Sequence, residues 1–330
     1  MKKTIRNVNI KSYAFFMVLI VILSHAQGAE PDYPNKPIRL IMPFTMGGLN
    51  ELTARPVMDR LSVRLGQSII FESRPGANGN IGTQVAAKST PDGYTLLLGF
   101  DGTLVINQYL YPNLPFDTAR DLIPISRLGD ATLILVAHPE VPANNIAELV
   151  SMSKRKPGTI FYGTAGNGSS GHIAAELLRI VSGANISHVP YKGGGPALLD
   201  VVGGQIPLVS TALVSALSFI KQGRVKAIGV SSAQRDPALP DVPTFAESGA
   251  AGYNVTSWTG ILAPAKTPRA IIERISREIN NVLSEPAVKA RYAEIGVVPG
   301  GNTPEEFAEL IRSDSVKWGK VIRDAGIKLQ

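Results

Sequence analysis

The chain has 330 residues, no cysteine and a formal net charge of +7 at neutral pH. The missing cysteines exclude disulfides, thiolate nucleophiles and cysteine-ligated metals, so the core alone must hold the fold. No cluster of Lys and Arg alternates with aromatic residues, which argues against a nucleic-acid partner. A chain of this length often splits into two domains.

The N-terminus has the layout of a secretory signal peptide. Four basic residues among the first eleven precede an unbroken apolar run at residues 13–23, and small residues suited to cleavage surround Ala26. The run is about 11 residues long, whereas a membrane span needs about 20, so cleavage is favoured over an uncleaved anchor. We expect residues 1–28 to direct export to the periplasm and then to be removed. Without those four basic residues the net charge of +7 becomes +3, a small excess that suits an anionic ligand.

Beyond the leader, strand and helix patterns alternate. Strands are expected at residues 38–42, 68–71 and 94–99, with helices at 51–65 and 79–88. After a surface connection at 110–121, extended segments are expected at 122–128, 132–137, 159–162, 186–190, 206–210 and 225–231. Helices are expected at 145–154, 170–182, after Pro196, at 268–284 and at 304–325, with a hairpin-like stretch at 256–262. This alternation predicts an α/β fold with mostly parallel sheets flanked by helices.

The two halves of the chain are alike at a coarse level, because each opens with a strand, a glycine-rich loop and a helix. In open α/β sheets ligands bind beside the carboxyl ends of strands, near helix N-termini. We therefore predict two lobes facing a shared ligand cleft. Residues 29–130 and 231–330 would form lobe 1 and residues 131–230 lobe 2. This discontinuous division rests on knowledge of folds and not on periodicity.

Two glycine-rich loops carry the chemistry. The first loop (residues 43–50, PFTMGGLN) and the second loop (residues 162–172, YGTAGNGSSGH) each lie between a strand and a helix. Backbone amides in such loops converge on an anion, and the helix dipole adds partial positive charge. Asn50 is a candidate N-cap. The hydroxyls of Thr164, Ser169 and Ser170 are suitable donors to a carboxylate. An ordinary tight turn is the alternative for the first loop.

Other chemistries fit the second loop poorly. Its glycines at 166, 168 and 171 match a dinucleotide fingerprint, but the next strand ends without the acidic residue that this motif needs. Ser169 or Ser170 with His172 lacks the spacing of a nucleophile and its base, so we expect His172 to be a packed or capping residue. The remaining histidines show no metal-binding spacing. We therefore expect no cofactor, metal or catalytic residue.

Ordered motifs along the mature chain resemble one family. They are residues 33–38 (YPNKPI), Pro43-Phe44 with Gly47-Gly48, 74–82 (RPGANGNIG), 114–117 (LPFD), 162–172, 189–193 (VPYKG) with Pro196-Ala197, and 240–244 (PDVPT). The chain resembles the substrate-binding proteins of tripartite tricarboxylate transporters, the Bug family of extracytoplasmic solute receptors.

The resemblance implies a two-lobed periplasmic binding protein fold that closes on a small carboxylate and delivers it to membrane permease subunits. Di- and tricarboxylates and aromatic acids such as terephthalate are the expected ligands, often held through backbone amides and bridging waters. We expect the receptor to act as a monomer. The ligand contacts that it implies in the two loops are Phe44, Thr45, Met46, Gly47 and Gly48, and Thr164, Ala165, Gly166, Gly168, Ser169 and Ser170.

Further cleft residues are expected outside these loops. Phe100, Asp101 and Thr103 follow the third strand, and Asn78 and Thr211 complete the predicted set. Trp258 is a candidate aromatic wall, with core packing as the alternative. Because an unpaired Asp101 would repel an acidic ligand, we expect its carboxylate to point away or to bind water.

Two departures from the family pattern affect selectivity. Glu51 stands where the family usually has an aspartate after the paired glycines, and Thr45 and Met46 stand where proline is common. The family also often has an aspartate near residue 211, where this chain has Val209-Ser210-Thr211. The missing acid favours plain carboxylates over amino acids.

A ligand sensor for a signalling partner and a secreted serine hydrolase are the alternative functions.

Overall fold

Ten strands of this chain form one mixed sheet in the computed structural model, which describes residues 33–46, 48–324 and 326–328. The predicted leader lies outside these described residues. From Lys36 onward the chain forms one compact unit. Within the described part of the chain, no helix combines the length and the apolar character that crossing a membrane requires.

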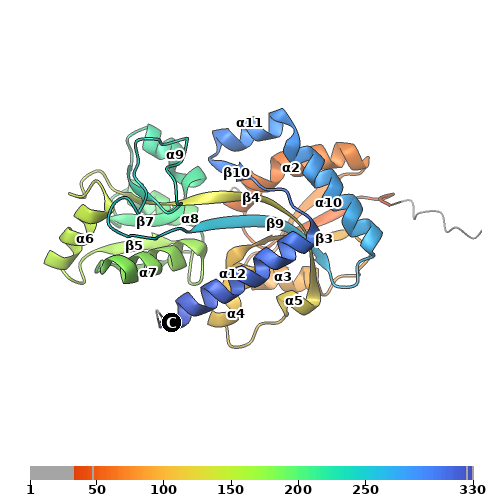
Figure 1. Ribbon diagram of the computed structural model, residues 1–330, viewed down its shortest axis with the longest axis horizontal. Helices are drawn as coiled ribbons and strands as arrows, with labels where there is room; N and C mark the ends of the chain where they lie inside the picture. The colour runs from red at the N-terminus through yellow and green to blue at the C-terminus, as the bar shows by residue number, and fades with distance from the viewer. Residues whose placement is uncertain (1–32, 47, 325, 329–330) are drawn as a thin grey trace, which may run out of the picture. The chain divides into compact units, whose positions relative to one another are not determined.

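Two groups of parallel strands build the ends of the sheet. The N-terminal group comprises β1 (Ile38–Met42), β2 (Ile69–Ser73) and β3 (Thr95–Phe100). The middle group comprises β5 (Phe161–Thr164), β6 (Ser187–Pro190) and β7 (Leu208–Ala212). Helices flank both groups (Figure 1), as the alternation of patterns predicts. The strand order is β2-β1-β3-β9-β4-β7-β5-β6, with β8 (Lys226–Val230) and β10 (Val297–Pro299) also paired to β4.

Two long strands, β4 (Leu122–Ala137) and β9 (Thr256–Pro264), join the two groups (Figure 1). The predicted extended segments 122–128 and 132–137 both lie in β4, but the strand also runs through the break expected between them. The hairpin-like stretch predicted at 256–262 is wrong, because these residues belong to the single strand β9. β4 continues through Gly129, which pairs with Thr259 of β9. A Cβ at Gly129 would lie 2.7 Å from Val297 and 2.9 Å from a carbonyl of β10, so the glycine admits the crossing strand.

The helices largely follow the predicted pattern. Those predicted from the sequence are α2 (Leu49–Leu65), α3 (Asn80–Ala87), α6 (Ile146–Arg155), α7 (Ser170–Ser182), α8 (Gly194–Val202), α10 (Arg269–Ser284) and α12 (Pro304–Asp324). Sequence analysis missed α4 (Asn107–Leu110), α5 (Thr118–Asp121), α9 (Leu213–Lys221), α11 (Pro286–Glu294) and the single turns η1 (Ala77–Gly79) and η2 (Gly102–Ile106). Helix α9 follows β7 directly, so no turn residue separates the two apolar runs.

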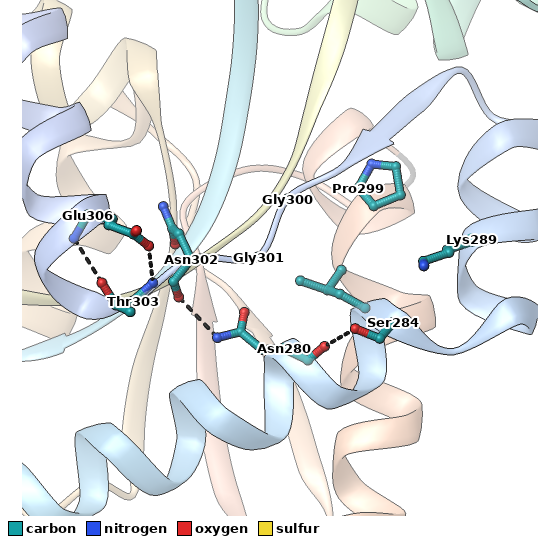
Figure 2. Close-up of a pocket in the computed structure, with 10 residues that line it drawn as sticks. Asn280, Ser284, Lys289, Pro299, Gly300, Gly301, Asn302, Thr303 and Glu306 are labelled. Atoms are coloured by element: carbon teal, nitrogen blue, oxygen red, sulfur yellow. Dashed lines mark hydrogen bonds between the residues drawn. The ribbon is translucent and has the colours of Figure 1, made fainter.

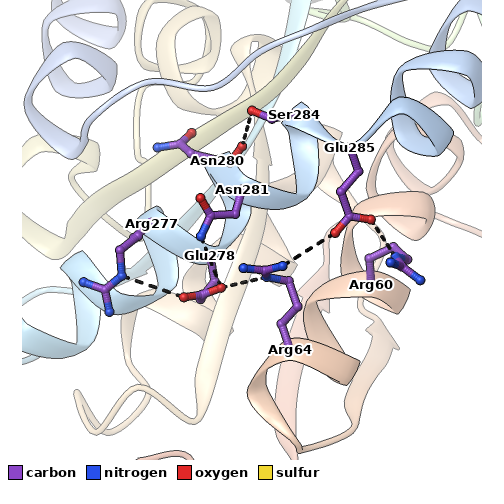
Figure 3. Close-up of polar contacts among 8 residues, drawn as sticks. All are labelled: Arg60, Arg64, Arg277, Glu278, Asn280, Asn281, Ser284 and Glu285. Carbon is purple, nitrogen blue, oxygen red and sulfur yellow. Dashed lines mark hydrogen bonds and ion pairs between the residues drawn. The ribbon is translucent and has the colours of Figure 1, made fainter.

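Ion pairs hold the C-terminal helix α10 against the N-terminal helix α2 (Figure 3). Arg64 Nε lies 2.7 Å from Glu278 Oε2, and Arg60 Nε lies 2.8 Å from Glu285 Oε2, just beyond the end of α10. These residues lie more than 200 positions apart in sequence. Helix α10 therefore packs beside α2, although the two lie far apart in the sequence.

Candidate functional site

Aromatic and hydroxyl groups gather where β1 and β3 end. The rings of Phe44 and Phe100 meet edge to face, with centroids 4.7 Å apart. Gly79, at φ +87°, lies against both Phe44 and Thr103, and a Cβ there would be 3.0 Å from the Phe44 ring. The first loop thus packs on the segment that follows β3. Within it Thr45, Met46 and Gly48 are exposed, and Gly47 lies outside the described residues.

Three asparagines form a hydrogen-bonded cluster next to Thr103. Asn107 is fully buried and donates from Nδ2 to the Asn78 carbonyl at 3.1 Å and to Asn80 Oδ1 at 2.6 Å. Its Oδ1 accepts from Asn78 Nδ2 at 2.8 Å. Thr103 Oγ1 also donates to the Asn78 carbonyl, at 2.8 Å. This bonding holds Asn78 in a left-handed conformation (φ 49°, ψ 42°), which asparagine tolerates better than most residues.

We expect Asn107→Ala to lower the free energy of unfolding by about 1–3 kcal/mol, because it leaves the buried Oδ1 of Asn80 without its donor and removes a partner of the half-buried Asn78. Urea unfolding followed by circular dichroism measures this change. Asn281→Ala, on the exposed face of α10, is the matched control and should shift stability by less than about 0.5 kcal/mol. Equal losses in the two variants would contradict this account of the cluster.

The second loop is held by two stacked histidines. His172 and His188 lie with ring centroids 3.9 Å apart. His172 Nδ1 accepts from the Gly168 amide at 3.2 Å, and His188 Nε2 lies 2.7 Å from Thr164 Oγ1. Burial lowers the pKa of His172 to about 4 and is the main reason that the pKa of His188 falls to about 3. Both rings are therefore neutral at physiological pH.

Hydroxyls of the second loop also have partners within the loop. Thr164 Oγ1 accepts from the Gly166 amide at 3.1 Å, and Ser169 caps α7 by accepting from the His172 amide at 3.3 Å. Ala165 is exposed. The prediction that His172 is packed or capping agrees with this geometry. Asn50 is not the cap of α2, whose N-cap is Gly48, because its Oδ1 instead accepts from Thr259 at 3.1 Å.

The second loop meets the cluster at the ends of β1 and β3. A Cβ at Gly168 would lie 3.2 Å from side-chain atoms of both Asn78 and Asn107. A Cβ at Gly102, next to Phe100, would lie 3.4 Å from the Gly168 carbonyl. The fold thus brings together predicted site residues from segments far apart in the sequence. They are Phe44, Asn78, Phe100, Asp101, Thr103, Gly168 and Ser170.

Asp101 lies at the centre of this junction. It is 1 % exposed, and its Oδ1 accepts from Ser170 Oγ at 2.8 Å and from Ser257 Oγ at 2.7 Å. Oδ2 has no hydrogen-bond partner among the described residues. Burial raises the pKa of Asp101 to about 7. The expected carboxylate is unpaired and points away or binds water, but the group is buried and paired with Ser170 and Ser257. The sequence does not indicate Ser257 as a partner.

Two further predicted residues have different neighbours. Trp258 is 2 % exposed, donates from Nε1 to Asp314 Oδ2 at 2.7 Å and packs edge to face on Phe307, which matches the core-packing alternative. Thr211, in β7, lies beside the start of α8, where a Cβ at Gly194 would be 2.9 Å from its hydroxyl.

A separate pocket of about 460 Å³ lies near the start of α12 (Figure 2). None of the predicted ligand residues lines it. Its polar groups already bond to one another. Glu306 accepts from the Thr303 amide at 2.8 Å, which caps α12, and Asn280 donates to the Asn302 carbonyl at 3.1 Å. We assign no ligand to this pocket.

Solved structures of periplasmic binding proteins share this fold. Rpa4515 of R. palustris, solved with adipate, superposes with a TM-score of 0.87 at 32% identity, over 90% of this chain and 100% of that one. MatC of Rhodopseudomonas palustris, solved with bound malate, gives 0.82 at 29% identity, over 88% and 100%. The periplasmic binding protein BugD gives 0.84 at 31% identity, over 90% and 100%. The predicted α/β periplasmic binding protein fold is confirmed.

The family model described as "Tripartite tricarboxylate transporter family receptor" matches residues 53–327. Protein BugT of Bordetella pertussis is 35% identical over 299 residues, which cover 90% of this chain and 92% of BugT. A Pseudomonas protein from a tcbD-tcbE intergenic region is 34% identical over 291 residues, which cover 88% of this chain and 86% of the relative. The chain belongs to the tripartite tricarboxylate transporter receptor family, whose members are solute receptors and not enzymes.

Proposed function

We propose that this receptor captures a small di- or tricarboxylate, or an aromatic carboxylate, between two lobes and delivers it to the membrane subunits of a tripartite transporter. Residues 29–130 and 231–330 would form one lobe and residues 131–230 the other. Residues 1–28 would act as a cleavable signal peptide that directs the chain to the periplasm.

The packing of both loops on the segments that carry Asn78 and Phe100 is the observation that carries this proposal. The second loop begins α7, a helix of 13 residues whose positive end favours an anion. Its Gly168 lies beside Asn78 and Gly102. Gly102 lies against the ring of Phe100, which pairs with Phe44 to supply an apolar wall. Thr45, Met46 and Gly48 are exposed residues in the same loop as Phe44, and we propose that their amides also face the ligand. Amides and aromatic rings together suit a carboxylate with a carbon skeleton.

Ligands of structural neighbours support the same class. Rpa4515 was solved with adipate and MatC with malate, so both hold plain dicarboxylates. The position where the family often has an aspartate carries Thr211 here, and this hydroxyl offers no charge to an ammonium group. We therefore propose that the receptor prefers carboxylates without an amino group.

Thermal denaturation of the mature protein with a ligand panel tests the proposal. A ligand that binds only the folded state stabilises it by about 2.7 kcal/mol at a hundred times its Kd. We expect stabilisation by adipate, malate, citrate or terephthalate and none by neutral sugars. Malate and aspartate form a matched pair that differs only in a hydroxyl or an ammonium group, and malate should bind more tightly. Stabilisation by sugars alone, or tighter binding of aspartate, would overturn the proposed selectivity.

A further inference from the structure

Asp101 connects three segments that are distant in the sequence. Ser170, 69 positions away, is the first residue of α7, and Ser257, 156 positions away, lies in β9. The two hydroxyls also lie 3.1 Å from each other. One carboxylate oxygen therefore joins the end of β3 to the helix that follows the second loop. A motion that carries α7 away from the end of β3 would break the bond to Ser170, and we expect it to expose Asp101 to water.

The surroundings of Asp101 make its charge costly. Three neutral donors lower the pKa of Asp101 and so favour its ionised form. They are the hydroxyls of Ser257 and Ser170 and the Gly102 amide. Asp314 of α12 is a like charge and disfavours ionisation. On α7, the His172 ring is stacked on His188, and Glu176 is bonded to Tyr162 and Arg179. No cation among the described residues is one of the groups that shift the pKa of Asp101, so its negative charge is not neutralised by an ion pair.

We propose that Asp101 takes up a proton when the receptor closes on a carboxylate ligand, an inference that rests on the proposed function. Closure moves the carboxyl group from water into the buried junction and brings an anionic ligand to the adjacent loops. Both changes disfavour the ionised form. The proton comes from solvent and goes to Oδ2, which has no partner in the described structure. Oδ1 keeps its bonds to Ser170 and Ser257.

The direction of the pH effect follows from linkage. The pKa of Asp101 is about 7 in the buried arrangement, against an ordinary value of 3.8 when the group is solvated. Between these values the closed form binds more protons than the open form. Ligand affinity should therefore be highest in acid and fall as pH rises from about 4 to about 7, by at most roughly tenfold per pH unit. Above that window Asp101 is ionised in both forms and the affinity levels off.

Titration calorimetry at pH 6 tests this inference, with adipate or malate, whichever binds more tightly, in buffers of different ionisation enthalpy. The dependence of the binding enthalpy on the buffer gives the number of protons taken up. We expect about one more proton per ligand for the wild-type receptor than for Asp101→Asn. The variant keeps the shape and the Oδ1 acceptor but cannot titrate. Subtracting it removes any proton that the ligand itself exchanges.

A second variant guards against misfolding of the first. Ser257→Ala removes one donor to the ionised carboxylate, so the pKa of Asp101 should rise further and proton uptake should persist to higher pH. Equal proton uptake by wild type and Asp101→Asn would overturn the inference while leaving carboxylate binding intact. Failure of every carboxylate to bind a folded wild-type receptor would overturn the proposed function and this inference together. An unchanged pH window in Ser257→Ala would also contradict the role of Asp101.

Discussion

Replacing Gly171 with alanine is expected to lower the free energy of unfolding by about 1–3 kcal/mol and to weaken carboxylate binding about tenfold. Gly171 is the second residue of α7, and a Cβ there would lie 2.5 Å from the carbonyl oxygen of Ser210 in β7. This neighbour is backbone, so it cannot rotate away. The helix must shift from the sheet and carry the second loop with it, which is why stability and binding should fall together.

Gly195→Ala is the matched control for this experiment. Gly195 lies in the first turn of α8, and a Cβ there meets no atom within 4 Å. Alanine favours a helix over glycine, so this variant should be neutral or slightly more stable. Urea unfolding and titration with the best carboxylate of the panel measure both effects. Equal stability of the two variants would show that α7 is not packed as tightly as the Gly171 contact requires.

Acidification is expected to destabilise the receptor through the stacked histidines. In the unfolded chain both rings protonate near pH 6.5, whereas in the folded state their pKa values fall to about 4 for His172 and about 3 for His188. The unfolded state therefore binds more protons between these values. Stability is fully present above about pH 6.5 and is lost as pH falls, by roughly 3 kcal/mol for each ring at pH 4, and the loss for His188 continues towards pH 3.

The measurement is the free energy of unfolding at pH 7.5, 6, 5 and 4.5 for wild type and for His188→Gln, which cannot gain this charge. Asp101 titrates in the opposite direction, because its raised pKa favours the folded state in acid. The informative quantity is therefore the difference between wild type and variant at each pH. This difference should shrink as pH falls, since the wild type alone pays the cost of keeping His188 neutral. A difference that is constant with pH would contradict a buried neutral pair.

Local patterns in the sequence predict most of the regular structure. Helix α7 begins and ends at the predicted residues 170 and 182, because Ser169 caps its start and Gly183, at φ 69°, ends it. Helix α9 was missed because an apolar run without a turn residue reads equally as strand or helix. The continuity of β4 was missed because Gly129 looks like a break. Its partner strands, distant in sequence, are what keep it extended.

The candidate site also has a part that could be predicted from the sequence and a part that could not. Glycine-rich loops are recognisable from local composition, so both loops could be found from the sequence. The residues that hold these loops in place could not be found in this way. Asn107 stands next to a segment rich in Pro, Asn and Asp that reads as a surface connection, yet its side chain is fully buried. Ser257 lies 156 positions from the carboxylate that it bonds, and no local pattern marks that pairing.

Strand β4 takes part in both halves of the sheet, so a change of length in this strand affects the strand pairing of both. Its residues up to Thr132 pair with β9, and those from Leu133 onward pair with β7 and β8. Side chains of a strand alternate between the two faces, so removing a single residue near residue 132 would turn the later side chains of β4 to the opposite face unless a further irregularity in strand pairing, like those already present near Ser126 and Gly129, compensated for it. A surface loop absorbs such a deletion, but this strand has no loop in which to absorb it. Insertions and deletions in this family should therefore avoid the stretch that the two halves share.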